Sequence, residues 1–253
     1  LGGTSMSSAV VTGAVACLTQ LFRIQYHGAD PAAPLMKGLL LHTARHAGSG
    51  SGPNYRFGWG LLDASAAADF IVSNGNNDQW MDMDSIAETN VEYLCSSSGL
   101  GSIKATLVWT DWPGLPTSGV QQYHIPNLIN DLDLSIIGPD GKHYPWTLDP
   151  EHPAEPARQD RVNRRDNVEQ ICIETPIAGT YIIRIGGQVN MGDEQIYTIC
   201  VSGLRRLECL PYLWILNPCG TKTVAGDTLI EVVSMGLTGQ ARLQINVDGK
   251  PWD

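Results

Sequence analysis

Residues 3–13 read Gly-Thr-Ser-Met-Ser-Ser-Ala-Val-Val-Thr-Gly, and this stretch decides how the start of the chain folds. Residues 5–26 are rich in Ala, Val and Leu on nearly every face, which predicts a helix surrounded by other elements of a large domain. Ser5 stands at the start of this helix, where backbone N–H groups lack intrahelical partners and favour the negative charge of a tetrahedral intermediate. The position therefore suits an acyl-transfer nucleophile. The alternative is that Ser5 only caps the helix, the commonest role of a serine there.

The helical pattern continues to about residue 74. Asp30 followed by Pro31 is a start signal for a helix that extends to residue 46. The glycine- and serine-rich residues 48–53 indicate a loop, and Asp63 is expected to cap a short helix over residues 64–72. Three helices are thus predicted in this part of the chain.

Two motifs in this helical part resemble those of the subtilisin-like serine proteases, the subtilases. Gly-Thr-Ser-Met-x-Ser at residues 3–8 is similar to the nucleophile motif of the family. Residues 55–64, with Gly58, Gly60 and Asp63, resemble its closing Gly-x-Gly-x-x-(Asp/Asn)-Ala segment. The resemblance implies that Ser5 is the acylating nucleophile and that its own N–H donates to the oxyanion. The chain departs from the family at Ala9, where proline is usual.

The other catalytic groups of the family are missing from the chain. In subtilases the order is Asp, His, then Ser, with an oxyanion Asn between His and Ser, so all three would precede Leu1. The six histidines all follow Ser5 and none lies in a His-Gly-Thr setting: His27, His42, His46, His124, His143 and His152. A serine without a base is a poor nucleophile, so the chain alone is expected to be inert.

Beyond residue 84 the pattern changes from helical to strand-like. Residues 74–84 are polar and are predicted to form a domain boundary. Short alternating or β-branched runs then follow without intervening helices, which predicts an antiparallel sandwich or barrel. The expected strands cover residues 89–94, 103–109, 132–137, 168–173, 180–185 and 195–201, with two more at 228–233 and 241–247.

This β region resembles the carboxy-terminal β-barrel domain of the alkaline, oxidation-tolerant subtilases, whose architecture is related to the P-domains of proprotein convertases. The segments that carry the resemblance are residues 107–114, 128–134, 138–141, 166–169 and 179–184. The predicted fold is the last part of an α/β subtilisin-type catalytic domain (residues 1–76), followed by an antiparallel β-sandwich or jelly-roll barrel (residues 85–203). The start of a further β module is expected in the tail, residues 204–253.

Aspartates gather at the start of one predicted strand. The alternation places Asp131 and Asp133 on one face, where two like charges are costly unless a cation or a donor lies between them. Oxygen ligands suit Ca²⁺, so Asp111, Asn130, Asp131 and Asp133 form a candidate calcium set. The equally weighted alternative is a carboxylate pair that caps loop N–H groups.

Composition limits the classes of partner. The formal net charge is −10 and the pI about 4.9, which argues against nucleic acid as a partner. The longest apolar stretches are too short to cross a bilayer. Six cysteines show no zinc spacing; Cys17 is expected to be a free core thiol, and Cys209 with Cys219 is the favoured local disulfide. The subtilase resemblance implies an extracellular or secretory location.

The function implied for the parent protein is endopeptidase cleavage of polypeptide substrates through an acyl-enzyme at Ser5, completed by the upstream part of the catalytic domain. One alternative is a pseudoprotease remnant or a binding and structural β module. A weaker alternative is a carbohydrate-binding jelly roll, which rests on the aromatic residues Trp109, Trp112, Tyr123, Tyr144 and Trp146.

Overall fold

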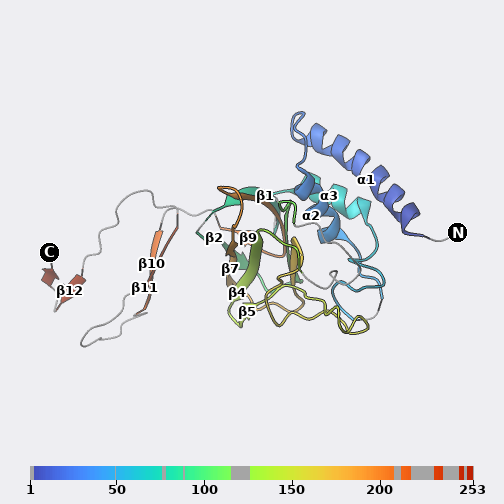
Figure 1. Ribbon diagram of the computed structural model, residues 1–253. Coiled ribbons are helices and arrows are strands. Elements are labelled where there is room, and N and C mark those ends of the chain that lie inside the picture. The colour runs from blue at the N-terminus through green and yellow to red at the C-terminus, as the bar shows by residue number, and fades with distance from the viewer. Residues whose placement is uncertain are drawn as a thin grey trace. The chain divides into compact units, whose positions relative to one another are not determined.

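The computed structural model describes residues 3–48, 50–75, 78–87, 89–114 and 126–207, and four strands between residues 212 and 252 (Figure 1). Contacts divide the chain into two compact units, Leu1–Leu207 and Glu208–Asp253. In the second unit, Tyr212–Asn217 (β10) pairs with Glu231–Met235 (β11), and Ile245–Val247 (β12) pairs with Lys250–Trp252 (β13). The tail therefore contains strands, as expected, and its role as a further module stays a prediction. Cys209 and Cys219 lie outside the described residues.

Three helices occur in the described part of the first unit: Thr4–Gln25 (α1), Ala33–Thr43 (α2) and Ala64–Ser73 (α3). The cap of α3 is confirmed, because Asp63 Oδ1 accepts a hydrogen bond from the Ala66 N–H at 3.0 Å. The predicted start of α2 is wrong. Asp30 does not cap this helix; its carboxylate instead accepts from Arg23 Nε at 2.6 Å.

Helix α1 is largely exposed in this chain. Its buried side chains are Leu18 and Phe22, whereas Val10 and Ile24 are 63% and 71% exposed. Cys17 also lies on the exposed surface, so its predicted place in a core is wrong for this chain. By length and composition alone α1 could cross a membrane, contrary to the expectation from the apolar stretches, but core helices of soluble proteins pass the same test.

Two antiparallel sheets make up the rest of this unit. Their strand orders are β1-β8-β3-β6 and β5-β4-β7-β2-β9. The antiparallel β-rich region is thus confirmed, while a jelly roll and a subtilisin-type α/β domain stay predictions. The bounds are Gln79–Ile86 (β1), Val91–Ser97 (β2), Ile103–Trp109 (β3), Asp131–Gly138 (β4), Gly141–His143 (β5), Val168–Ile173 (β6), Gly179–Gln188 (β7), Gln195–Ser202 (β8) and Arg205–Arg206 (β9).

One hydrophobic core joins the two sheets. Alternate residues of β4, such as Leu132 and Leu134, meet residues of the other sheet, such as Leu107, in one cluster of fully buried side chains. Tyr93 of one sheet and Tyr197 of the other bring their hydroxyl groups within 3.0 Å. Burial therefore accounts for the alternation that predicted these strands.

The predicted boundary at residues 74–84 is wrong from residue 79 onward, because β1 occupies Gln79–Ile86. β1 pairs with β8 along its whole length and sends Trp80 and Ile86 into the core. The polar residues that suggested a linker include Asp82, which pairs with Arg206 at 2.7 Å at the sheet surface.

The helices cover the other face of the four-stranded sheet (Figure 1). A second core contains Phe22 of α1, Leu39 of α2 and Ile71 of α3, together with Cys200 of β8. Gly38 lets α2 approach the sheet, since a Cβ there would lie 3.4 Å from a methyl carbon of Val108. The predicted division into domains of residues 1–76 and 85–203 stays a prediction, but both parts lie within one compact unit.

Candidate active site

Ser5 lies within the first turn of α1 and is exposed. The N-cap is Gly3, with φ 157° and ψ 145°, and no side chain caps the helix. The alternative that Ser5 is the cap therefore does not describe this structure. The first N–H groups of an α-helix have no intrahelical acceptor, so Ser5 Oγ stands beside free donors.

The described histidines do not form hydrogen bonds with Ser5. His42 is buried between α2 and the sheet, where its ring nitrogens contact Thr106 Oγ1 at 2.9 Å and Ser202 Oγ at 2.7 Å. Burial, helped by the charge of Lys104, lowers the pKa of His42 to about 3, so the ring is neutral near pH 7.

Two other histidines pair with nearby carboxylates. His143 Nε2 lies 3.0 Å from Asp140, and His152 Nδ1 lies 2.8 Å from Asp149. The hydrogen bond to Asp149 raises the pKa of His152. His124 lies outside the described residues. That this chain holds no base for Ser5 stays a prediction.

The second motif forms a tight corner beside α2. Arg45 and Leu61 exchange backbone hydrogen bonds of 2.9 and 2.8 Å. Gly60, with φ 118°, lies against this bridge, and a Cβ there would come within 2.2 Å of the Arg45 carbonyl oxygen. Glycine is therefore required at this position for both conformation and space.

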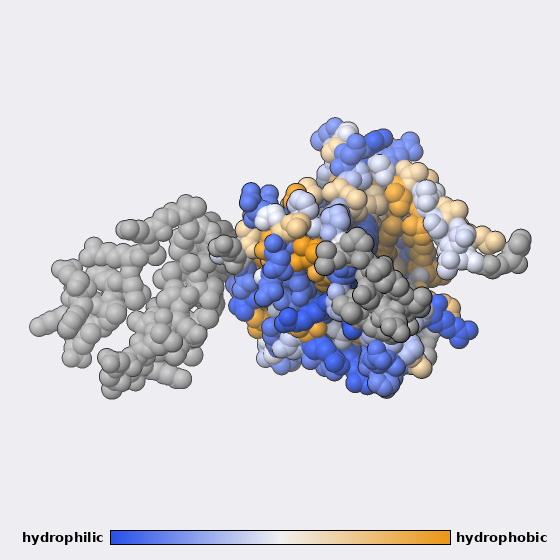
Figure 2. Space-filling view, viewed as in Figure 1, coloured by the Kyte–Doolittle hydropathy of each residue, from blue (hydrophilic) through white to orange (hydrophobic). Residues whose placement is uncertain are grey.

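An apolar cavity of about 550 Å³ lies between α1, α2 and this corner. Hydrophobic residues gather under α1 in the space-filling view (Figure 2). The lining residues are Val11, Val15, Ala33, Met36, Lys37, Leu40, Leu41, Ala44, Trp59, Gly60 and Leu62. An apolar concavity beside an exposed apolar helix is a surface that another element of a protein could cover.

The candidate calcium ligands Asp111 and Asn130 are engaged with the backbone. Asp111 accepts N–H groups from Trp112, Ile129 and Asn130 at 2.7–2.9 Å. The side-chain oxygen of Asn130 accepts two backbone N–H groups of residues 190–191, and its amide donates to Met191 O and Gln195. Their observed role is to hold loops together.

Asp131 and Asp133 lie near a third carboxylate, Glu169 of β6. One oxygen of each is buried without a hydrogen-bond partner in the described structure: Asp131 Oδ1, Asp133 Oδ1 and Glu169 Oε1. Glu169 Oε2 accepts from the Leu134 N–H at 2.5 Å. Burial, reinforced by Asp133 and Asp131, holds the pKa of Glu169 well above its ordinary value.

Arg164 supplies positive charge to the two aspartates. Burial raises the pKa of both Asp131 and Asp133, and Arg164 opposes that effect in each. An arginine thus meets part of the need for a cation that the sequence suggested. Among the described residues, no group of three or more His, Cys, Asp or Glu residues could hold a metal ion. Calcium at Asp111, Asn130, Asp131 and Asp133 stays a prediction without support from this geometry.

Sequence reasoning missed Glu169 and Arg164. Glu169 could have been noticed, since it occupies an inward position in the alternating run of residues 168–173. Arg164 lies about 30 residues from Asp133 along the chain, and no local pattern links the two.

One residue of the predicted aromatic platform is not available for stacking. Trp109 is 1% exposed and donates to Asn130 O at 3.0 Å, so it cannot stack on a sugar, and Tyr123 lies outside the described residues.

Comparison with known proteins matches part of the chain to a family model and most of it to a curated relative. Residues 1–60 match the model of the subtilase family. The chain is 27% identical over 219 residues to the serine protease/ABC transporter B family protein tagA of Dictyostelium discoideum. The match covers 79% of this chain but 12% of that protein, so the chain spans a small part of its relative.

Two solved structures show distant likenesses. A periplasmic lysozyme inhibitor of g-type lysozyme from Aeromonas hydrophila has a TM-score of 0.27 and 13% identity, over 50% of this chain and 87% of that chain. A protein of Sulfurospirillum deleyianum has a TM-score of 0.25 and 10% identity, over 48% and 97% of the two chains. The family match and the relative support a serine-protease-like origin, at family level, for the part of the chain that contains Ser5.

Proposed function

We propose that this chain is part of a subtilisin-type serine endopeptidase that cleaves polypeptides through an acyl-enzyme on Ser5. The observation that carries the proposal is the position of Ser5: exposed, not used as a cap, and in the first turn of α1 within the segment that matches the subtilase family. This is the geometry in which helix N–H groups stabilise an oxyanion.

In the proposed reaction, Ser5 Oγ bonds to the substrate carbonyl carbon while a histidine takes the hydroxyl proton. That histidine returns the proton to the leaving amine as the C–N bond breaks. Water then hydrolyses the ester and frees Ser5. The described residues supply the nucleophile and N–H donors, and the base, its aspartate and the oxyanion asparagine come from elsewhere in the parent protein.

The apolar cavity under α1 supports this division of labour. We infer that the upstream part of the catalytic domain covers the cavity and the exposed side of α1. Each Å² of apolar surface removed from water in this way would stabilise the domain by about 25 cal/mol. The proposed substrates are polypeptides, and the subtilase resemblance favours an extracellular or secretory location. Calcium binding at Asp131 and Asp133 belongs to the same proposal.

A non-catalytic module is the second candidate. His42 and the two carboxylate-paired histidines already have partners away from Ser5, as expected if the helical part only braces the sheets. The candidates differ in what the parent protein does, because an acyl-enzyme needs all triad members together.

The test uses the full-length parent protein, its Ser5→Ala variant and a Ser7→Ala control from the same helical turn. A fluorophosphonate probe should label the parent and the control at Ser5, and should fail to label Ser5→Ala. Peptide hydrolysis should follow the labelling, and the isolated 253-residue chain should show neither. Full hydrolysis by Ser5→Ala would refute the role of Ser5, and an unlabelled, inactive parent that contains Asp-Thr-Gly and His-Gly-Thr motifs upstream would favour the non-catalytic module.

A further inference from the structure

We propose that a pocket beside β6 binds an acidic segment of a polypeptide through arginine side chains. The pocket has a volume of about 340 Å³, within the range of small-ligand sites. Four arginines line it and define what we call the arginine pocket: Arg158, Arg161, Arg164 and Arg165. The proposal does not depend on Ser5 or on catalysis, and it concerns a different part of the chain.

The loop that carries these arginines is braced by its own hydrogen bonds and is tied to β6, where the Cys172 N–H donates to Gln159 Oε1 at 2.8 Å. It runs between β5 and β6, and Thr147 and Arg158 exchange backbone hydrogen bonds of 2.8 and 3.0 Å across it. Asn163 is 4% exposed, donates to Asp166 at 2.9 Å and accepts the Arg165 N–H at 3.0 Å. Because its backbone is fixed at both points, the loop presents the arginines without a large cost of ordering on binding.

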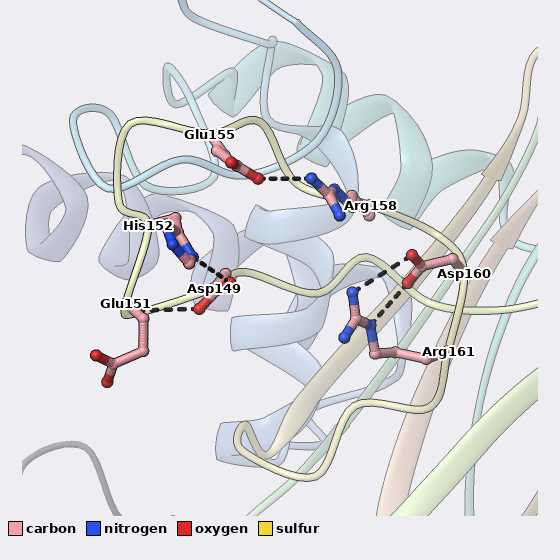
Figure 3. Close-up of polar contacts among 7 residues, drawn as sticks. All are labelled: Asp149, Glu151, His152, Glu155, Arg158, Asp160 and Arg161. Carbon is pink, nitrogen blue, oxygen red and sulfur yellow. Dashed lines mark hydrogen bonds and ion pairs between the residues drawn. The ribbon is translucent and has the colours of Figure 1, made fainter.

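Two of the arginines hold carboxylates of this chain already. Figure 3 shows Arg158 with Glu155 and Arg161 with Asp160. Arg158 Nη2 lies 2.5 Å from Glu155 Oε2, and Arg161 Nε lies 2.7 Å from Asp160 Oδ1. The two arginines and their two acidic partners are about half exposed. Exposed ion pairs contribute only about 0–1 kcal/mol each to stability. A carboxylate from a ligand can therefore replace Glu155 or Asp160 at little cost.

Arg158 and Arg161 also keep N–H donors that their acidic neighbours do not use. A guanidinium carries five N–H donors, and the hydrogen bonds of Arg158 and Arg161 to their acidic neighbours use one and two of them. Arg164 lines the same pocket and adds positive charge to it. Planar guanidinium groups bind carboxylates through two parallel hydrogen bonds, which makes a row of them selective for acidic side chains.

The lining also contains the carboxylates of Asp149 and Glu155, and its apolar part favours a polypeptide over other anions. Leu148, Pro156 and Val162 provide apolar contacts that a peptide with aliphatic and acidic residues can use, and that a bare phosphate cannot. The net charge of −10 repels highly charged polyanions such as nucleic acid at long range. A short segment with two or three carboxylates is repelled only weakly by the net charge of the chain, and it can form hydrogen bonds with the arginines inside the pocket.

The test is fluorescence anisotropy of the 253-residue chain with a labelled hexapeptide that contains three glutamates between aliphatic residues. The matched peptide has glutamine in place of glutamate. We expect the acidic peptide to bind and the glutamine peptide not to bind. Arg158→Gln with Arg161→Gln should weaken binding about tenfold or more, whereas Arg23→Gln, which removes an exposed ion-paired arginine on α1, should leave it unchanged.

A gain-of-function variant guards against misfolding as the explanation. Glu155→Gln removes the internal competitor of Arg158 and should tighten binding, about threefold for an exposed ion pair. Inorganic phosphate as competitor tests the other source of anions: displacement of the peptide only at high millimolar phosphate supports the proposal. Equal binding of both peptides, no effect of the arginine substitutions, or binding of phosphate but not of the peptide would overturn it.

Discussion

His42 attaches α2 to the four-stranded sheet, and we expect it to make the stability of the chain fall in acid. The ring contacts Thr106 and Ser202, and Lys104 Nζ donates to the His42 carbonyl oxygen at 3.1 Å. The ring is 3% exposed and lies edge-on to Phe70 at 5.1 Å. Both ring nitrogens thus have hydrogen-bond partners. A second proton would place a positive charge on the ring, where water cannot solvate it.

The sign and size of the effect follow from the pKa of His42. Its value is about 3 in the folded chain and about 6.5 in the unfolded chain. The unfolded chain therefore binds the extra proton first as the pH falls. The contribution to stability is complete above pH 6.5 and decreases below it by up to about 1.4 kcal/mol per pH unit, or about 3 kcal/mol by pH 4. This is a large share of the stability of a typical domain.

The assay is urea unfolding of the chain at several pH values between 4 and 8, followed by circular dichroism. The variant His42→Gln keeps a donor and an acceptor but cannot titrate, and His46→Gln is the matched control at an exposed histidine. Between pH 7 and pH 4, the loss of stability should be about 3 kcal/mol smaller in His42→Gln than in the control. Carboxylates contribute equally to both curves, so parallel curves would refute the assigned role of His42.

Three further predictions concern the corner, the carboxylates and the domains. Gly60→Ala should lower the free energy of unfolding by at least about 2 kcal/mol, because its Cβ would strike the Arg45 carbonyl, whereas Gly58→Ala, with open space at its Cβ, should cost less; equal losses in urea unfolding would contradict this. If Asp133 binds calcium, free calcium should raise the midpoint of thermal unfolding, and Asp133→Asn should abolish the rise. A midpoint that changes with neither calcium nor a chelator would refute calcium binding. A fragment of residues 79–207 should unfold cooperatively, while a fragment of residues 1–76 should not, and limited proteolysis that spares only the latter would reverse that prediction.

The strands were the most predictable feature. The expected ranges 103–109 and 168–173 coincide with β3 and β6, because both runs alternate between a core and a second buried face. β1 was missed because Asp84 is exposed and Asp82 pairs with Arg206, in an edge strand that pairs with one neighbour only. Its membership of the sheet depends on β8, more than a hundred residues away, and no local pattern reports that pairing.

The candidate sites were predictable only where one segment contains the whole signal. Ser5 could be proposed as a nucleophile because it and the helix that surrounds it with N–H groups are adjacent in sequence. The calcium set could not be judged in the same way, since Asp111 and Asn130 are engaged by N–H groups from segments near and far in the chain. Arg164 and Glu169 approach the aspartates only in the folded chain, and both alter the charge balance on which the calcium prediction rested.

Motif and packing divide this chain at different places. By motif, α2 goes with the helix of Ser5, within residues 1–60 that match the subtilase family model. By packing, α2 lies against β3 and β8, where Gly38 and His42 fit the sheet, and α3 shares the core of α1 and α2. The β region therefore serves as the base on which α1 is held in this chain. Weakening the α2 interface, by acid or at His42, should loosen the helix that carries Ser5 before the core between the two sheets is exposed, because that core lies on the opposite face of the four-stranded sheet.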